Sequence, residues 1–211
     1  MIRYGVLMLA AVAASVVLAG CFGNGSVEPQ ARAAAQTRCL DRPGWQKLAT
    51  RIGAPVYCPG WMPDPLDGRI GSRWNNIFAV DRDRSYLMSW VWQETGPGTA
   101  GGELHVNLRG YPGRSRIPTC TDTRLTASGN SRSVKLPCFA DPNGHRRAAG
   151  IEATLYTVNQ DADQWHVLYA WRRGGSLYTL SEHVAPPLTY TKVVANLDRM
   201  LRSLVLVRPA R

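Results

Sequence analysis

Residues 164–183 read "QWHVLYAWRRGGSLYTLSEH", and this stretch decides the type of fold. Two runs rich in aromatic and aliphatic residues, 164–171 and 176–183, flank the sequence "RRGG". Paired glycines between two such runs are typical of a tight β-hairpin. A third run of the same kind, "IEATLYTV", occupies positions 151–158. The three runs together predict neighbouring strands of an antiparallel sheet.

Further strand patterns lie on the amino-terminal side of this stretch. "NNIFAV" (75–80) and "SYLMSWVWQ" (85–93) are separated by the polar turn 81–84. The clearest alternation is "ELHVNLR" (103–109), which predicts a strand with one buried face and one face in water. Its inward residues are Leu104, Val106 and Leu108, and its outward residues are Glu103, His105, Asn107 and Arg109. Residues 110–150 are rich in turn residues, with short strands expected on either side of Gly129 and Asn130.

Helix patterns stand at the two ends of this strand-rich region. Near residue 45, apolar residues fall at i, i+3, i+4 and i+7, with Asp41 as a cap and Gly53 as a stop signal. These residues are Trp45, Leu48, Ala49 and Ile52. The proline-rich segment 54–65 cannot be helical. A longer apolar stripe follows Thr189, which can cap it: Val193, Val194, Leu197, Met200, Leu201 and Leu204. We therefore expect an α+β fold, a twisted antiparallel sheet with an N-terminal and a C-terminal helix packed on it.

The first 21 residues form a pattern of their own. After Arg3, an uncharged and mostly apolar run of 14 residues (5–18) leads to "LAGC" at Leu18–Cys21. A membrane-spanning helix needs about 20 apolar residues, so an export signal fits this run better than an uncleaved anchor helix. The tetrapeptide resembles the lipobox of bacterial lipoproteins. That resemblance implies a diacylglyceryl group on Cys21 and cleavage before it, and hence a chain attached to the cell membrane by lipid, outside the cytoplasm.

This interpretation divides the chain into three parts. Residues 1–20 are the expected signal peptide, 21–38 a lipid-attached tether, and 39–211 a single globular domain. Four cysteines remain after Cys21: Cys39, Cys58, Cys120 and Cys138. An even number in an exported chain favours disulfides, and of the three pairings we expect the two between neighbours, with separations of 19 and 18 residues. A Cys₄ metal site would need closely spaced pairs such as Cys-x-x-Cys, so no metal is expected.

The charge is strongly positive and almost entirely due to arginine. Formal net charge is +10, with only three lysines among the 25 basic residues. The arginines are spread along the chain, which favours a solvated surface over one dedicated basic patch. A diffuse positive field would assist approach to an anionic lipid, a glycan or an envelope protein. No nucleic-acid motif accompanies the charge, so nucleic acid is not an expected partner.

Residues with catalytic chemistry are few and scattered. The four histidines, His105, His145, His166 and His183, do not fall at metal-ligand spacing. His105 is expected in solvent, whereas His166 and His183 could meet across the hairpin only if the register allows it. No Gly-x-Ser-x-Gly or Ser-x-x-Lys motif occurs, and Thr189 is better explained as a helix cap than as a nucleophile beside Lys192. No catalytic residue and no cofactor are therefore assigned.

Aromatic residues are the unusual feature, with seven tryptophans in 211 residues. One strand face would carry Trp90 and Trp92, and another Trp165, Tyr169 and Trp171. On an exposed face they could stack on a sugar ring or hold an apolar ligand, but alternation favours the core.

Three segments, "APVYCPGWMPDP" (54–65), "WRRGGSLYTLSEH" (171–183) and "YTKVVANLDRMLRSL" (190–204), resemble a family of bacterial extracytoplasmic domains of unknown function. The resemblance implies an α+β fold and an envelope location, and it transfers no catalytic residue. We expect a lipid-anchored envelope module that binds a ligand or partner without catalysis. The alternative is a cell-wall-directed hydrolase or transferase with a site that its motifs do not reveal.

Overall fold

The computed structural model describes residues 38–64, 66, 77–93, 103–158 and 165–210. The expected signal peptide, Cys21 and all of the tether except Arg38 lie outside the described residues, as do Asn75 and Asn76. The described part is mostly sheet, with two helices and two disulfides, consistent with the α+β class. No helix within it is long and apolar enough to cross a membrane.

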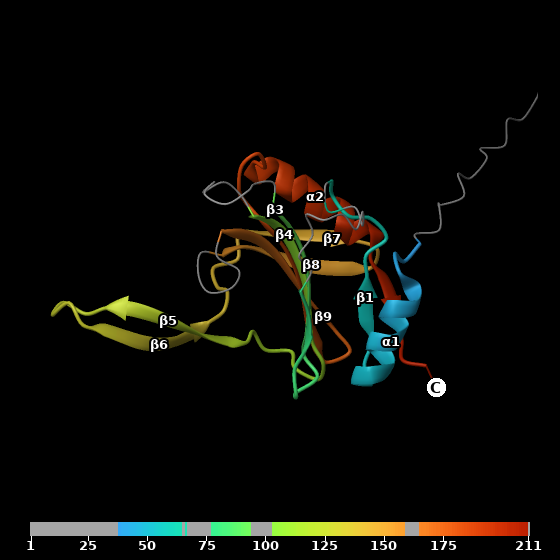
Figure 1. The fold of residues 1–211 in the computed structure, drawn as a ribbon, viewed down its shortest axis with the longest axis horizontal. Helices are drawn as coiled ribbons and strands as arrows, with labels where there is room; N and C mark the ends of the chain where they lie inside the picture. Colours follow the sequence, from blue (N-terminus) through green and yellow to red (C-terminus); the bar gives the residue numbers. More distant parts are fainter. Residues whose placement is uncertain (1–37, 65, 67–76, 94–102, 159–164, 211) are drawn as a thin grey trace, which may run out of the picture. The chain divides into compact units, whose positions relative to one another are not determined.

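A seven-stranded antiparallel sheet forms the centre, in the order β2-β3-β4-β10-β9-β8-β7 (Figure 1). The strands are β2 (Ile77–Val80), β3 (Tyr86–Gln93), β4 (Glu103–Tyr111), β7 (Gly144–Ala148), β8 (Ile151–Val158), β9 (His166–Arg173) and β10 (Ser176–His183). The expected "RRGG" hairpin joins β9 to β10, and Gly174 and Gly175 have φ values of 55° and 75°. Glycine accommodates this left-handed backbone without strain, which explains the paired glycines.

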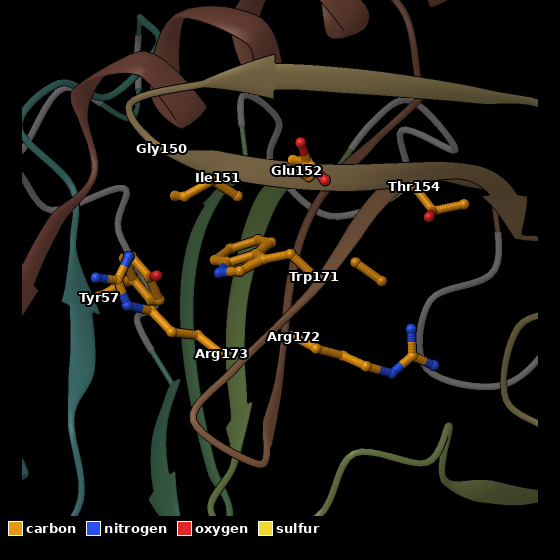
Figure 2. A pocket seen from close by; sticks show the side chains of 9 residues that line it. Tyr57, Gly150, Ile151, Glu152, Thr154, Trp171, Arg172 and Arg173 are labelled. Carbon is orange, nitrogen blue, oxygen red and sulfur yellow. The ribbon is translucent and has the colours of Figure 1, made fainter.

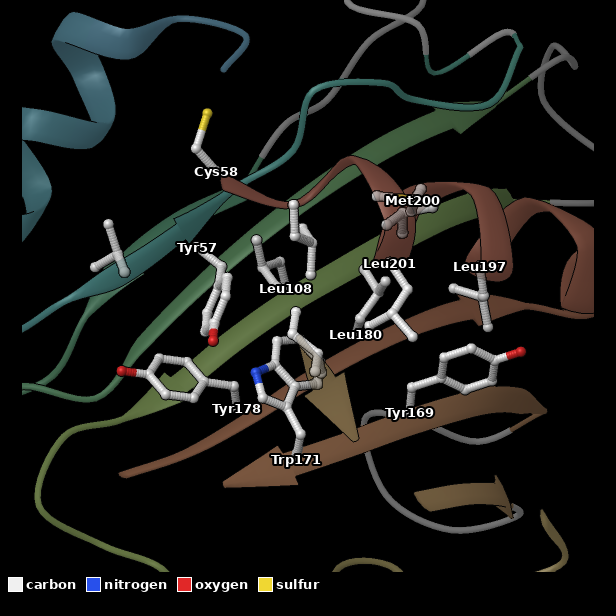
Figure 3. Packing of buried hydrophobic residues seen from close by; sticks show 14 of the residues in the cluster. Tyr57, Cys58, Leu108, Tyr169, Trp171, Tyr178, Leu180, Leu197, Met200 and Leu201 are labelled. Atoms are coloured by element: carbon white, nitrogen blue, oxygen red, sulfur yellow. The ribbon is translucent and has the colours of Figure 1, made fainter. Parts of the chain in front are cut away.

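One face of the sheet carries the main core. Helix α2 (Tyr190–Ser203) packs on β10, β9 and β7, and Thr189 caps it by accepting a hydrogen bond from the Lys192 backbone N–H at 3.3 Å. Figure 3 shows Leu197 and Leu201 of this helix facing Tyr169 and Leu180 of the sheet. Of the predicted stripe, five residues are buried and Val194 is half-buried.

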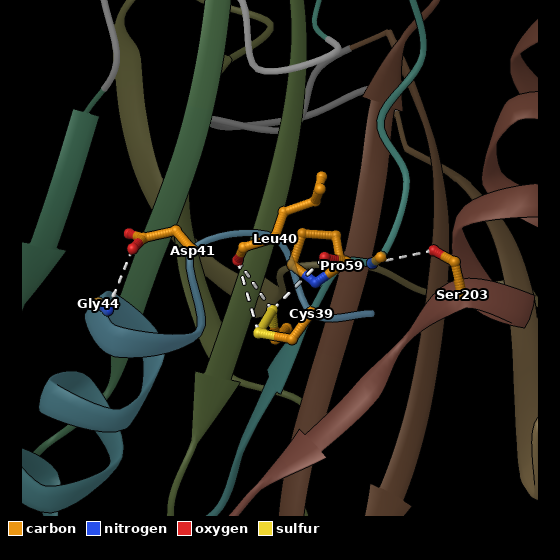
Figure 4. The surroundings of a disulfide bond; sticks show 8 residues. Cys39, Leu40, Asp41, Gly44, Pro59 and Ser203 are labelled. Atoms are coloured by element: carbon orange, nitrogen blue, oxygen red, sulfur yellow. Dashed lines mark hydrogen bonds between the residues drawn. A yellow bond between two sulfur atoms is a disulfide. The ribbon is translucent and has the colours of Figure 1, made fainter. Parts of the chain in front are cut away.

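A small ribbon and the other helix cover the rest of that face. Strands β1 (Val56–Cys58) and β11 (Val205–Val207) pair with each other, and α1 (Arg42–Ile52) packs mainly on this ribbon. The helix reaches the large sheet through Trp45, whose ring lies 6.2 Å from that of Trp90. The Cys39–Cys58 disulfide joins the segment before α1 to β1, and Ser203 at the end of α2 accepts a hydrogen bond from the Gly60 N–H (Figure 4).

The expectation that residues 103–109 form a strand with one face in water is wrong, because the opposite face of the sheet is largely covered. Asn107, predicted to face water, is buried, as are Ser89, Thr179 and Ser181 on neighbouring strands. One end of this face carries a second apolar cluster, comprising Phe139, Tyr156, Val158, Leu168, Ala170 and Leu177. The alternation identified the side facing α2 correctly, but an alternating pattern with polar residues cannot show whether other segments cover them.

Strands β5 (Thr119–Leu125) and β6 (Ser131–Pro137) form a separate two-stranded hairpin, which we call the arm. Figure 1 shows it extending away from the seven-stranded sheet. The Cys120–Cys138 disulfide closes its base, so each disulfide joins neighbouring cysteines. The expected grouping of Trp165 with Tyr169 and Trp171 is wrong, because Trp165 precedes β9 and is 59% exposed.

Candidate ligand pocket

Strands β8 and β9 run side by side for only part of their length. Their pairing ends at Thr154 and Ala170. Beyond this point β8 continues to Ile151 paired only with β7, and β9 continues to Arg173 paired only with β10. The facing edges of residues 151–153 and 171–173 are therefore not paired with each other. Unpaired strand edges present backbone N–H and C=O groups that can bind another molecule.

A pocket of about 400 Å³ opens where the two strands diverge (Figure 2). Its lining comes from the turn before β8, from β8 and β9, and from β1: Gly150, Ile151, Glu152, Thr154, Ala170, Trp171, Arg172, Arg173 and Tyr57. The volume lies toward the lower end of the range for small-molecule sites, which is roughly 300–1,000 Å³.

Tyr57 and Trp171 form the aromatic part of this lining. Their rings meet edge to face, with centroids 5.2 Å apart, and each residue is 2% exposed. Neither the Tyr57 hydroxyl nor the Trp171 Nε1 has a hydrogen-bond partner within the described part of the chain. Both atoms lie beneath the lining surface, and Figure 2 shows the indole nitrogen on the side of Tyr57. Leaving a buried donor unsatisfied costs about 1–3 kcal/mol, so this corner is energetically unfavourable as it stands.

The charged side chains around the pocket differ in whether they already have an ion-pair or hydrogen-bond partner. Glu152 forms an exposed ion pair with Arg147, and Arg172 donates from Nε to the Ser115 carbonyl at 2.7 Å. Arg173 is exposed and forms no ion pair with any described residue. An uncommitted guanidinium beside open backbone amides favours a ligand that brings hydrogen-bond acceptors.

Three of the four histidines meet on the face of the sheet opposite α2. His183 lies directly opposite His166 in the β9–β10 register, and continuing the β4–β10 register places His105 on the other side of His183. Ring centroids are 4.5 Å apart for His105 and His166, 4.9 Å for His105 and His183, and 5.2 Å for His166 and His183. His105 is thus not the freely solvated residue that its alternation suggested.

The orientation of these rings argues against a shared metal ion. His183 stacks on His105 and on His166 with interplanar angles of 28° and 24°. Imidazole lone pairs lie in the ring plane, so nearly parallel rings do not aim their nitrogens at one point. No group of three or more potential metal ligands in the described ranges is arranged to hold an ion. His145 is exposed on β7, away from this cluster in the register.

Among the acids that the structure describes, Glu182 has a clearly raised pKa, and it faces away from the histidines. It is 1% exposed, and Asn196 of α2 donates a hydrogen bond to its Oε1 at 2.8 Å. Burial raises the pKa of Glu182 to about 8, against the smaller lowering effects of Asn196 and Lys192. Because successive strand residues alternate in direction, Glu182 lies under α2 while His183 lies on the other face. The acid and the histidines therefore do not form one catalytic cleft.

Sequence reasoning missed most of the pocket. The pattern placed Arg172 and Arg173 in a hairpin turn and left Tyr57 in a proline-rich segment. The early end of β8–β9 pairing has no local signal, because it depends on where two separate strands diverge within the sheet. The chain matches no protein-family model, no curated protein and no solved structure.

Proposed function

We propose that this protein is a lipid-anchored component of a bacterial cell envelope whose folded domain binds a small ligand in the β8–β9 pocket. The lipobox-like "LAGC" ending at Cys21 supports the anchor. The two disulfides are compatible with a location outside the cytoplasm, where thiols are readily oxidised.

The observation that carries the binding role is the divergence of two strands within a sheet. Residues 151–153 and 171–173 leave backbone groups open at the pocket, Trp171 and Ile151 provide an apolar surface, and Arg173 provides an uncommitted cation. A ligand that satisfies all three has amide or carbonyl groups, an apolar part and a negative charge. A short peptide or an acylated amino acid with a free carboxylate has this combination.

No specific observation supports the alternative that the protein is a hydrolase or transferase. Its expected signature is an acid and a histidine converging in one cleft. Glu182 and the three clustered histidines lie on opposite faces of the sheet.

Binding can be tested with N-acetyl-leucine, its uncharged methyl amide and N-acetylglucosamine as probes, by NMR of the Trp171 indole N–H. We expect N-acetyl-leucine to shift this signal in a saturable way and the methyl amide to bind more weakly. Arg173→Gln should weaken N-acetyl-leucine binding about tenfold, the size of one charge-assisted hydrogen bond.

Arg82→Gln is the matched control, because Arg82 is an exposed arginine in the turn between β2 and β3. Equal loss in both variants would show only an effect of net charge. If N-acetylglucosamine alone shifts the signal, the pocket binds a glycan. If no probe shifts the Trp171 signal, the pocket is not the binding site proposed for it.

A further inference from the structure

The arm contributes almost nothing to the core of the domain. Every side chain from Thr119 to Pro137 is exposed or half-buried. The described strands pair β5 only with β6, so each strand of the arm has an outer edge outside any sheet. A two-stranded ribbon is at best marginally stable in water. The disulfide at its base therefore closes an element whose own side chains bury little apolar surface.

The arm also carries an unfavourable arrangement of charge. Arg124 lies directly opposite Arg132 in the β5–β6 register, and like charges at such positions are destabilising. Asp122 balances only one of them, through an ion pair with Arg124 at 3.1 Å. Lys135 adds a third exposed cation, hydrogen-bonded to the Thr121 hydroxyl. The arm therefore has three cations and one anion, a net charge of +2 over Thr119–Pro137.

Both faces of the arm carry groups that suit a phosphate. In the pairing of β5 with β6, Thr121, Thr123, Ser131 and Ser133 are exposed on one face together with Lys135, whereas Arg124 and Arg132 share the other face. The four hydroxyls can donate hydrogen bonds to anionic oxygens. Leu125, next to Arg124 and close to the turn, is 79% exposed. Cations, hydroxyls and one exposed aliphatic side chain near the tip fit the boundary between lipid headgroups and acyl chains.

We propose that the arm is a second membrane contact, which binds the anionic headgroups of the lipid surface. The inference rests on the proposed anchor for the identity of that surface. Cys21 precedes Cys39 by 18 residues, which span about 60 Å at most when fully extended. A lipid on Cys21 would thus keep the domain close to the headgroups, and a weak contact becomes effective when it is intramolecular. Each cation near an anionic surface strengthens binding about fivefold.

The test uses the full chain with Cys21→Ala, which removes the acyl anchor, and its co-sedimentation with vesicles. One set of vesicles contains phosphatidylglycerol in phosphatidylcholine, and the other contains phosphatidylcholine alone. We expect binding to the anionic vesicles that weakens with added salt. Arg124→Gln with Arg132→Gln should weaken it more than tenfold, because two cations are lost from the contact. All variants share residues 1–20, so any contribution of the apolar run cancels in the comparison.

Arg42→Gln with Arg51→Gln is the matched control, since both arginines are exposed on α1 and the charge change is the same. Equal loss in both double variants would mean that diffuse charge binds the lipid and would overturn the proposal. Unchanged binding of the Arg124→Gln, Arg132→Gln variant to the anionic vesicles would overturn it too. A dimer in solution that the arm variant abolishes would identify a second copy as the partner instead. Mass measurement of the wild-type chain tests lipidation separately, so failure of the anchor and failure of the arm are distinguishable.

Discussion

Glu182 shows how a single buried residue couples this fold to pH. Its carboxyl is enclosed between β10 and α2, with one oxygen bonded to Asn196 and Oε2 without a partner among the described residues. A negative charge there would lose its hydration and gain only one strong donor, so the neutral form is favoured and the pKa rises to about 8. At neutral pH the carboxyl is therefore mostly protonated, because its burial under the helix disfavours the charged form.

We predict that Glu182→Gln removes a pH-dependent loss of stability. Below about pH 4.5 the carboxyl is protonated in the folded and unfolded chains alike. Between about 4.5 and 8 the unfolded chain has released this proton while the folded chain keeps it, so the free energy of unfolding falls as pH rises. The variant should match the wild type at pH 4 and exceed it by on the order of 3–5 kcal/mol above pH 8.

Urea unfolding at a series of pH values measures this difference. Glu152→Gln makes the same charge change at an exposed position and should show no such divergence. A constant gap between Glu182→Gln and the wild type across the range would contradict the assignment.

A second group of polar side chains, of which Arg146 and Asp198 are half-buried, joins three separate elements. The Tyr169 hydroxyl donates to Asp198 Oδ1 at 2.7 Å, and Arg146 Nε donates to the same oxygen at 3.1 Å. Strands β9 and β7 are thereby joined to α2 through one carboxylate. Burial and the adjacent Asp198 both raise the pKa of Tyr169, so its hydroxyl remains a donor at physiological pH.

At the scale of elements, helix α2 stabilises the fold by packing on one face of the sheet. Leu197 is fully buried between the helix and the sheet. We predict that Leu197→Ala lowers the free energy of unfolding by about 2–5 kcal/mol, because it leaves a cavity at a site that cannot collapse easily. Denaturant unfolding followed by tryptophan fluorescence measures the change. Val194→Ala on the same helix should cost clearly less, since Val194 is half-buried.

The arm should respond to loss of its disulfide as a separate element. We predict that Cys120→Ala with Cys138→Ala exposes residues 119–137 to proteases while the unfolding midpoint of the sheet changes little. No tryptophan lies in the arm, so fluorescence reports the rest of the domain. Cys39→Ala with Cys58→Ala should lower that midpoint, because this bond ties α1 to β1 and its loop closure is worth roughly 3 kcal/mol. An equal fall for both double variants would mean that the arm unfolds together with the core.

The elements that the sequence predicted best are those with a local pattern. Strands β8 and β10 and helix α2 have apolar periodicity, a glycine turn or a capping threonine within their own residues. The pairing of β1 with β11 joins Val56 to Val207 across most of the domain, and nothing in either three-residue strand specifies the other. The burial of Asn107 likewise depends on segments that are distant in the sequence. The contact between His105 and His183 depends on the register of β4 with β10. The pocket follows from where β8 leaves β9, which is a property of the whole sheet.

For the whole molecule, the decisive question is where the chain resides. We predict that the wild-type protein recovered from its native membrane lacks residues 1–20 and carries a diacylglyceryl group on Cys21. Cys21→Ala should abolish both changes, because the thioether requires that sulfur and cleavage follows its formation. Intact mass and detergent-phase partitioning measure the two outcomes.

Cys39→Ala with Cys58→Ala should leave the acyl mass in place, since those sulfurs form a disulfide within the domain. A wild-type chain without acyl mass, found wholly in the aqueous phase, would refute the anchor. The folded domain and its pocket would then need to be explained as those of an unattached protein.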